Sequence, residues 1–270
     1  MKFAFSSLAA PHASFASLVG WAKEFGFDGV ELCALPGEPA EVRGVFESAG
    51  VEVACLASSI AMAPQRRKRA ALAAEVRIWI DAAQRLGCRW VKILDTRAAP
   101  GETGNSAAVE LAGWLLPLAD YAAERGVTLV VENALSFRKA REVWMLLESI
   151  DHPNVAACWD VFNAAQAGES PYVSVPSLNS RIQYARVKEV QATPQGAQYC
   201  KLGEGEIPVQ SFITRLRGIG YAGYVTIETA EGLLSDSIIK LRHWAAPTAV
   251  KTAAPRSTPA RTVAVLKRDG

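Results

Sequence analysis

VTLVVEN, at residues 127–133, is a run of apolar and β-branched residues that ends in a carboxylate, Glu132. A short run that is apolar at nearly every position predicts a strand buried on both faces, as in a parallel sheet. A charge at the end of such a strand needs a partner or a chemical role, because burying it unpaired is costly. Three other runs end in the same way: GVEL at Glu31, VAACWD at Asp160 and YVTIE at Glu228. We therefore expect the fold to bring these four carboxylates together.

Strand-like and helix-like segments alternate along the chain, and glycine or polar residues bound each strand-like run. Eight strands are predicted, at Lys2–Ser6, Gly29–Cys33, Val51–Ala57, Arg89–Asp95, Val127–Asn133, Asn154–Asp160, Arg181–Lys188 and Tyr224–Glu228. Eight strand–helix pairs in about 245 residues predict an α/β fold of the (β/α)8 TIM-barrel type. A doubly wound open sheet is the main alternative, but no glycine-rich fingerprint for a dinucleotide follows any strand.

Three connections carry more specific expectations. A helix is predicted from Phe137 to Ser149, and a helical region interrupted by prolines from Phe162 to Leu178. A long polar loop is predicted after the seventh strand, as far as Gly205.

Length and composition fit one barrel domain, predicted at residues 1–244 of the 270. From Ala245 the sequence changes to Ala, Pro, Thr and basic residues, so residues 245–270 are predicted to be a flexible tail. The tail carries a net charge of +4, which leaves the rest of the chain near −2. The barrel therefore shows no sign of attraction to nucleic acid.

The five cysteines form no CxxC pair, so reduced and mostly buried thiols are expected rather than a zinc site or disulfides. No apolar stretch reaches the roughly 18 residues of a membrane span. The N-terminal run is interpreted as the first strand rather than a signal peptide. A soluble cytoplasmic protein without a membrane partner is therefore expected.

Residues that end the strands of a TIM barrel project into the mouth at its C-terminal face, where active sites lie. In chain order the predicted strand ends are Glu31, Asp95, Glu132, Asp160, Arg186 with Lys188, and Glu228. Converging carboxylates repel one another, so a divalent cation or buried basic residues must offset their charges. Lys92 and Lys188 are candidates for projecting into the mouth or for pairing with a neighbouring acid. Glu31 is a candidate for a barrel-closing salt bridge.

Six pieces of the sequence, by their order and spacing, resemble the sugar phosphate isomerase/epimerase family, the xylose-isomerase-like TIM barrels. They are GFDGVEL (26–32), VVEN (130–133), CWDVFNA (158–164), YARVKEV (184–190), LGEGEIP (202–208) and GYAGYVTIE (220–228). The resemblance covers about residues 2–244. It implies a divalent metal held by Glu132, Asp160, a histidine on the seventh strand, and Glu228. It also implies that the two glutamates transfer protons on either face of a keto sugar or polyol.

Histidines are absent from the positions where this family's pattern has them. Arg186 stands in place of the metal-binding histidine on the seventh strand, and Asn163 in place of the histidine three residues after Asp160. Arginine cannot ligate a metal, because its guanidinium stays protonated and has no free lone pair.

Two interpretations follow. In the first, Glu132, Asp160 and Glu228 hold magnesium or manganese as an all-oxygen site, and Arg186 binds an acidic or phosphorylated substrate. In the second, Arg186 occupies the place of the metal and pairs with the carboxylates. The site is then free of metal, with an altered chemistry or none.

The resemblance implies an isomerase or epimerase of a sugar, keto sugar or polyol, with Glu132 and Glu228 as the acid/base pair. Glu31 resembles an acid with which this family contacts its substrate, and the barrel-closing salt bridge is the alternative. The other candidate substrate-binding residues are Asn163, Arg186, Lys188 and Lys92, of which the two lysines are candidates for contacting a sugar oxygen or a phosphate. A dehydratase or lyase on a keto-inositol or keto-glycoside starts with the same proton abstraction and is the nearest chemical alternative. A barrel that binds sugar without catalysis is the alternative from another class. The resemblance further suggests a homo-oligomer.

Overall fold

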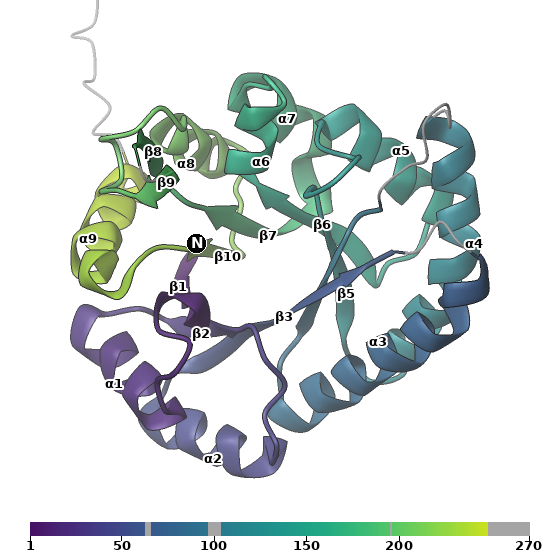
Figure 1. The fold of residues 1–270 in the computed structure, drawn as a ribbon, viewed down its shortest axis with the longest axis horizontal. Helices are drawn as coiled ribbons and strands as arrows, with labels where there is room; N and C mark the ends of the chain where they lie inside the picture. Colours follow the sequence, from purple (N-terminus) through teal and green to yellow (C-terminus); the bar gives the residue numbers. More distant parts are fainter. Residues whose placement is uncertain (63–65, 97–103, 195, 248–270) are drawn as a thin grey trace, which may run out of the picture.

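A computed structural model of the protein describes residues 1–62, 66–96, 104–194 and 196–247. Residues 98–103 of one predicted loop, and the predicted tail from residue 248 onward, lie outside this described part. Eight parallel strands close into a barrel in the order β1-β10-β7-β6-β5-β4-β3-β2, and helices surround it (Figure 1). The prediction of a (β/α)8 TIM barrel is therefore confirmed.

The strands of the barrel are β1 (Lys2–Ser6), β2 (Gly29–Leu32), β3 (Glu52–Ala61), β4 (Trp90–Leu94), β5 (Thr128–Glu132), β6 (Val155–Asp160), β7 (Ile182–Val187) and β10 (Tyr224–Ile227). The helices are α1 (Phe15–Phe25), α2 (Pro39–Ala49), α3 (Arg66–Leu86), α4 (Gly104–Ala123), α5 (Ala140–Ile150), α6 (Val161–Gln166), α7 (Pro171–Leu178), α8 (Val209–Gly218) and α9 (Leu234–Ala245). Short 3-10 turns cover Ser7–Ala9, Asn179–Arg181 and Glu231–Leu233.

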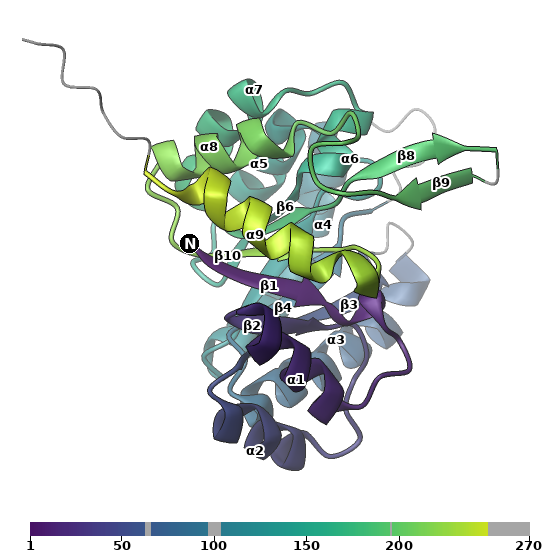
Figure 2. The same ribbon diagram turned by 90° about the vertical axis from the view of Figure 1, so that its left-hand side faces the viewer.

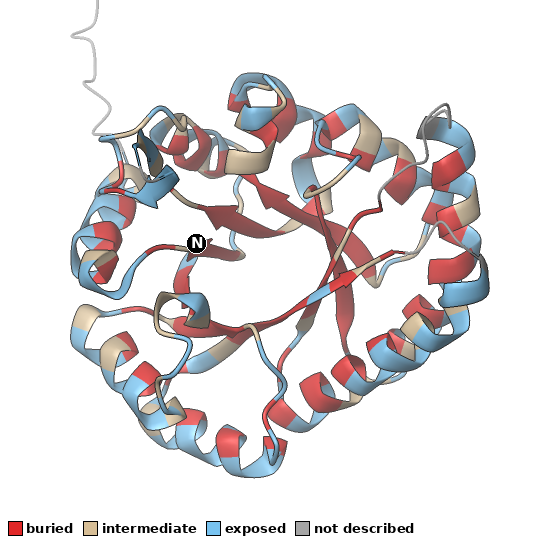
Figure 3. Cartoon of the chain, in the orientation of Figure 1, coloured by how far each residue is buried: buried red, intermediate tan, exposed pale blue. Residues whose placement is uncertain are grey.

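Local sequence explains where the helices begin and end. The α1 helix begins after Ser14, whose hydroxyl accepts a hydrogen bond from the Ser17 N–H (3.1 Å), as N-cap residues do. It ends at Gly26, whose φ of +82° is a left-handed conformation that glycine adopts without strain. The helices bury their inner faces against the strands and expose their outer faces, as Figure 3 shows.

Three sequence predictions need correction. The helical region at residues 162–178 is two helices, because Gly168, at φ +72°, ends the first and Ser170 caps the second. The long polar loop after the seventh strand contains an antiparallel hairpin, β8 (Val190–Thr193) with β9 (Gly196–Tyr199). Figure 2 shows this hairpin extending from the end of the barrel toward which β1 points. The fifth predicted helix also begins later than expected, at Ala140 instead of Phe137.

Inside the barrel the side chains form layers. Trp90, Tyr184 and Tyr224 lie near the N-terminal ends of their strands, with ring centroids 6.1–6.4 Å apart. Arg186 lies two residues beyond Tyr184 on β7, so strand alternation points it into the barrel one layer nearer the C-terminal mouth. Asp160 on β6 pairs with Arg186 in register. The aromatic layer thus forms the floor beneath the charged residues.

Within the described ranges, no helix combines the length and the hydrophobicity that crossing a membrane requires.

Candidate active site

Arg186 is the centre of the mouth of the barrel. Its Nη2 donates to Glu31 Oε1 (3.0 Å) and to Glu228 Oε2 (2.7 Å), and its Nη1 donates to Glu132 Oε1 (3.0 Å). The Arg186 side chain is 5% exposed, so these charge-assisted hydrogen bonds form almost entirely out of water. One guanidinium therefore ties together carboxylates from three strands.

Glu132, at the end of β5, is held on every side. Lys92 on β4 donates to its Oε2, and Asn163 Nδ2 on α6 lies 3.5 Å from its Oε1, which Arg186 also contacts. Burial alone would raise the pKa of Glu132, but the charges of Arg186 and Lys92 outweigh it and lower this pKa to about 2. Burial alone would lower the pKa of Lys92, but the negative charges of Glu132 and Glu31 together outweigh it and raise this pKa. Glu132 is thus firmly ionised and fully paired.

Glu228, at the end of β10, is the carboxylate of the cluster that reaches a cavity. Its Oε2 accepts from Arg186, its Oε1 accepts from the Tyr199 hydroxyl (2.6 Å), and Lys188 Nζ lies 3.5 Å from Oε1. Burial alone would raise its pKa. The charges of Arg186 and Lys188, with the hydrogen bond from Tyr199, outweigh burial and lower the pKa.

Asp160 serves the start of a helix. Its Oδ1 accepts from the Phe162 N–H (2.8 Å) and caps α6, and its Oδ2 lies 3.5 Å from Lys188 Nζ. Its backbone is fixed by Asn133, which accepts from the Asp160 N–H (2.7 Å) and donates to the Asp160 carbonyl (3.1 Å). Burial raises the pKa of Asp160, against the opposing charge of Lys188.

The structure thus brings all eight predicted site residues into one network: Glu31, Lys92, Glu132, Asp160, Asn163, Arg186, Lys188 and Glu228. Asp95, which the strand pattern also placed at the mouth, has another role. It accepts hydrogen bonds from the backbone N–H groups of Ala134 (3.2 Å) and Leu135 (2.6 Å), and so anchors the loop that follows β5.

The donor set does not fit the divalent cation that the family resemblance implies. Arg186 occupies the space between Glu132 and Glu228, and Asp160 is committed to a helix cap and to Lys188. A dication about 4 Å from a guanidinium is repelled by on the order of 8 kcal/mol at an effective dielectric of 20. Among the described residues, no group of three or more His, Cys, Asp or Glu side chains is arranged to hold a metal ion.

A cavity of about 610 Å³ opens beside this network. Glu228 and Lys188 form its charged wall, and Phe162, whose ring centroid lies 4.8 Å from Lys188 Nζ, forms an apolar wall. The hairpin supplies Val190, Ala197, Gln198 and Tyr199. An apolar surface with a few convergent polar groups is the usual form of a small-molecule site, and this volume lies within the usual range for such a site.

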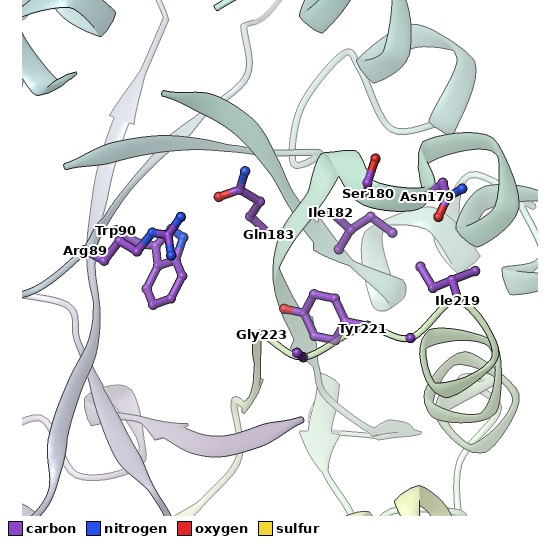
Figure 4. A pocket seen from close by; sticks show the side chains of 11 residues that line it. Arg89, Trp90, Asn179, Ser180, Ile182, Gln183, Ile219, Tyr221 and Gly223 are labelled. Carbon is purple, nitrogen blue, oxygen red and sulfur yellow. The ribbon is translucent and has the colours of Figure 1, made fainter. Parts of the chain in front are cut away.

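A second cavity, of about 390 Å³, lies at the opposite end of the strands (Figure 4). Arg89 and Trp90 form one side of it, Tyr221 lies across from them, and Gln183 lies between. This N-terminal end contains none of the candidate acids. In TIM barrels that end contributes to stability, while the C-terminal end carries the chemistry.

Sequence reasoning missed Tyr199, because residues 189–205 were interpreted as a loop. Residues 190–193 and 196–199 flank the pair Pro194-Gln195, and Gly196 follows that pair. Two short strand-compatible segments joined by a short connection that contains glycine are a hairpin signal. That signal could have placed Tyr199 at the base of a hairpin, close to the end of β7.

A search of curated proteins gave no match. Among solved structures, an L-ribulose 3-epimerase is similar at 17% identity and a TM-score of 0.78, over 90% of this chain and 94% of that chain. The D-allulose 3-epimerase of Methylomonas sp. in complex with D-allulose has 17% identity and a TM-score of 0.75, over 90% and 96%. A xylose isomerase domain protein of Planctomyces limnophilus has 18% identity and a TM-score of 0.74, over 90% and 95%. At these identities the similarity is one of fold.

The sequence of this chain also matches a protein-family model. The model of the xylose isomerase-like TIM barrel family covers residues 19–247, most of the chain. This chain therefore belongs to the xylose isomerase-like TIM barrel family.

Proposed function

We propose that this protein is an isomerase or epimerase of a sugar, keto sugar or polyol, and that it transfers the proton through a carboxylate. The observation that carries the proposal is the position of Glu228. It lies on the wall of the 610 Å³ cavity, with its two oxygens held by Arg186 and Tyr199. The family and the ketose 3-epimerase structures similar in fold support this class of reaction.

The contacts favour a reaction that needs one carboxylate. Epimerisation with two bases requires Glu132 as well as Glu228, on opposite faces of the substrate. Lys92 contacts one carboxylate oxygen of Glu132 and Arg186 contacts the other, and Glu132 is only 3% exposed. In an aldose–ketose isomerisation, Glu228 takes the proton from the hydroxyl-bearing carbon beside the carbonyl. It returns that proton to the neighbouring carbon, while the hydroxyl proton moves to the other oxygen.

Positive charge at the site comes from the protein in this proposal. The enediolate formed by proton removal carries negative charge on oxygen, and Lys188 on the cavity wall is placed to stabilise it. Arg186 lies behind Glu228 and keeps that carboxylate oriented. Because the donor set does not fit a divalent cation, the proposed reaction has no step through one.

The described cations favour a neutral substrate over a phosphorylated one. Arg186 is shared by three carboxylates, and Lys92 is bound to Glu132. Lys188 is the cation of this network that lines the cavity, and its single charge, shared with Asp160 and Glu228 at 3.5 Å, suits one enediolate oxygen rather than a phosphate. A phosphate, with a charge near −2, would need cations that these pairings do not leave over.

A sugar-binding barrel without catalysis is the second candidate. It is favoured by the lowered pKa values of Glu132 and Glu228, because a carboxylate of low pKa is a weak base. The two candidates share the cavity and differ only in proton transfer, so one measurement separates them.

The experiment is proton NMR in D2O, with the purified protein incubated with neutral aldoses and ketoses such as xylose, fructose, ribulose and allulose. Isomerase activity predicts loss of the C–H signal beside the carbonyl and the appearance of a second sugar. Glu228→Gln should abolish both, while Tyr172→Phe, at an exposed tyrosine on α7, should leave them unchanged. Binding detected by saturation transfer without deuterium exchange would support the second candidate. Activity that requires added manganese would refute the metal-free reaction.

A further inference from the structure

The hairpin β8–β9 has little support of its own. Its β9 residues are all exposed, and a two-stranded hairpin that packs on nothing is only marginally stable in water. Its base is firmly built: buried Glu189 accepts from the Gly203 N–H (3.0 Å) and the Ile207 N–H (2.9 Å). The Cys200 N–H donates to the Glu189 carbonyl (3.1 Å). The position of the hairpin therefore depends on what its side chains contact beyond this base.

Tyr199 joins the hairpin to the network of charged residues around Arg186. Its hydroxyl donates to Glu228 Oε1 at 2.6 Å, on the oxygen opposite to the one that Arg186 Nη2 contacts at 2.7 Å. Burial and the charge of Glu228 raise the pKa of Tyr199, so the hydroxyl remains a neutral donor. One short hydrogen bond on each oxygen fixes the rotation of the Glu228 carboxylate.

The neighbours of Glu228 show what the loss of this bond would do. Without the Tyr199 hydroxyl, Oε1 retains only Lys188, at 3.5 Å, among its contacts in the described structure. Arg186 lies on β7 and Lys188 directly follows it, so the carboxylate would be drawn toward that strand. Asp160 on β6 and Glu132 on β5 repel the Glu228 carboxylate, and as carboxylates they donate no hydrogen bond to it.

We propose that Tyr199 is the positioning residue for Glu228: it holds the carboxylate toward the cavity and fixes the hairpin as the cavity's outer wall. The catalytic consequence rests on the proposed isomerase function, whereas the anchoring of the hairpin does not. Tyr199 also lines the cavity, so binding of the sugar and orientation of the base involve the same side chain.

Tyr199→Phe tests this by removing only the hydroxyl. We expect kcat to fall about 10-fold or more, the factor that corresponds to one hydrogen bond to a charged group. KM should change less than 3-fold, because the ring still forms the wall. The matched control is Tyr172→Phe. The Tyr172 hydroxyl has no hydrogen bond within the described chain, and both kinetic constants should stay at their wild-type values. An unchanged kcat in Tyr199→Phe would overturn the positioning role.

Hydrogen exchange of the backbone amides at residues 190–193 and 196–199 tests the anchor without a substrate. Tyr199→Phe and Glu228→Ala should each speed this exchange about 10-fold, and the double variant should exchange no faster than either single one. Unchanged exchange in Tyr199→Phe overturns the proposal. If the wild-type protein proves to have no isomerase activity, the proposed function fails, and the exchange data still decide whether Tyr199 holds the hairpin through Glu228.

Discussion

Replacing Arg186 by methionine removes the guanidinium and keeps a side chain of similar length and flexibility. Arg186 donates three hydrogen bonds, at 2.7–3.0 Å, to Glu31, Glu132 and Glu228. With Asp160 the cluster holds four acids against three cations, so the variant changes its formal charge from −1 to −2. Breaking a buried ion pair by removing one partner typically costs about 3–5 kcal/mol.

A second route gives a similar magnitude. The variant can relax if one carboxylate takes up a proton. From the ordinary glutamate pKa of 4.5, protonation costs about 3.4 kcal/mol at pH 7 and about 0.7 kcal/mol at pH 5. We therefore expect Arg186→Met to lower the free energy of unfolding by about 3–4 kcal/mol at pH 7 and by about 1 kcal/mol at pH 5.

Urea denaturation at pH 7 and pH 5, followed by tryptophan fluorescence and far-UV circular dichroism, measures both values. Arg43→Met is the matched control. Arg43 contacts Glu47 at 2.7 Å on the exposed face of α2, where such a pair contributes about 0.3–0.5 kcal/mol. A loss for Arg186→Met below about 1 kcal/mol at pH 7, or an equal loss at both pH values, would refute the view that the guanidinium balances the buried carboxylates.

Three further predictions concern acid stability, metal binding and the hairpin base. Because the pKa of Glu132 is lowered to about 2, its ion pairs stabilise the fold fully above pH 4.5. The free energy of unfolding should therefore fall by about 3 kcal/mol as the pH falls toward 2. Equal free energies of unfolding at pH 5 and pH 3 would contradict this. Metal analysis and calorimetry with Mn²⁺ should show no stoichiometric binding by the natural protein. Arg186→His should bind the metal, because a neutral imidazole can ligate it. Stoichiometric metal on the natural protein would count against the metal-free site. In Gly205→Ala, the new Cβ would lie 2.5 Å from Glu189 Oε1, so denaturation should show a free energy of unfolding lower by about 1–3 kcal/mol. The control Gly113→Ala in α4, where the new Cβ has nothing within 4 Å, should raise the free energy of unfolding by about 0.5–1 kcal/mol. Similar effects of the two variants would show that the hairpin base tolerates the methyl group.

The barrel could be predicted from the sequence because each of its strands is buried on both faces. Such strands are continuous apolar runs, and glycines at the helix ends separate them from the helices. The observed strands agree with the prediction to within a few residues. The largest difference is at β3, which continues to Ala61 although it was expected to end at Ala57. The hairpin was missed because no alternating hydrophobic pattern marks its two strands, of which β9 is exposed throughout, and because the Pro-Gln-Gly sequence at 194–196 was interpreted as part of a loop.

The location of the site could also be predicted, but its pairings could not. The strand ends indicate that Glu31, Glu132 and Glu228 lie at one mouth, because parallel strands share a direction. Whether Arg186 points among these acids or away from them depends on its register in β7 and on the aromatic layer beneath it. Both are properties of the assembled barrel. Likewise, Tyr199 meets Glu228 only because a hairpin of a particular length follows β7, and no residue spacing in the sequence records that contact.

Arg186 also limits how this sequence can change over evolution. A neutral residue at position 186 would leave buried carboxylates short of a cation, at a cost of about 3–5 kcal/mol out of the 5–15 kcal/mol that holds a typical domain folded. A change to histidine would therefore require a metal to be present when the chain folds, or prior loss of one of the acids. Selection for folding alone is enough to retain the arginine, and it would keep these charged residues in place through periods when their chemistry is not selected.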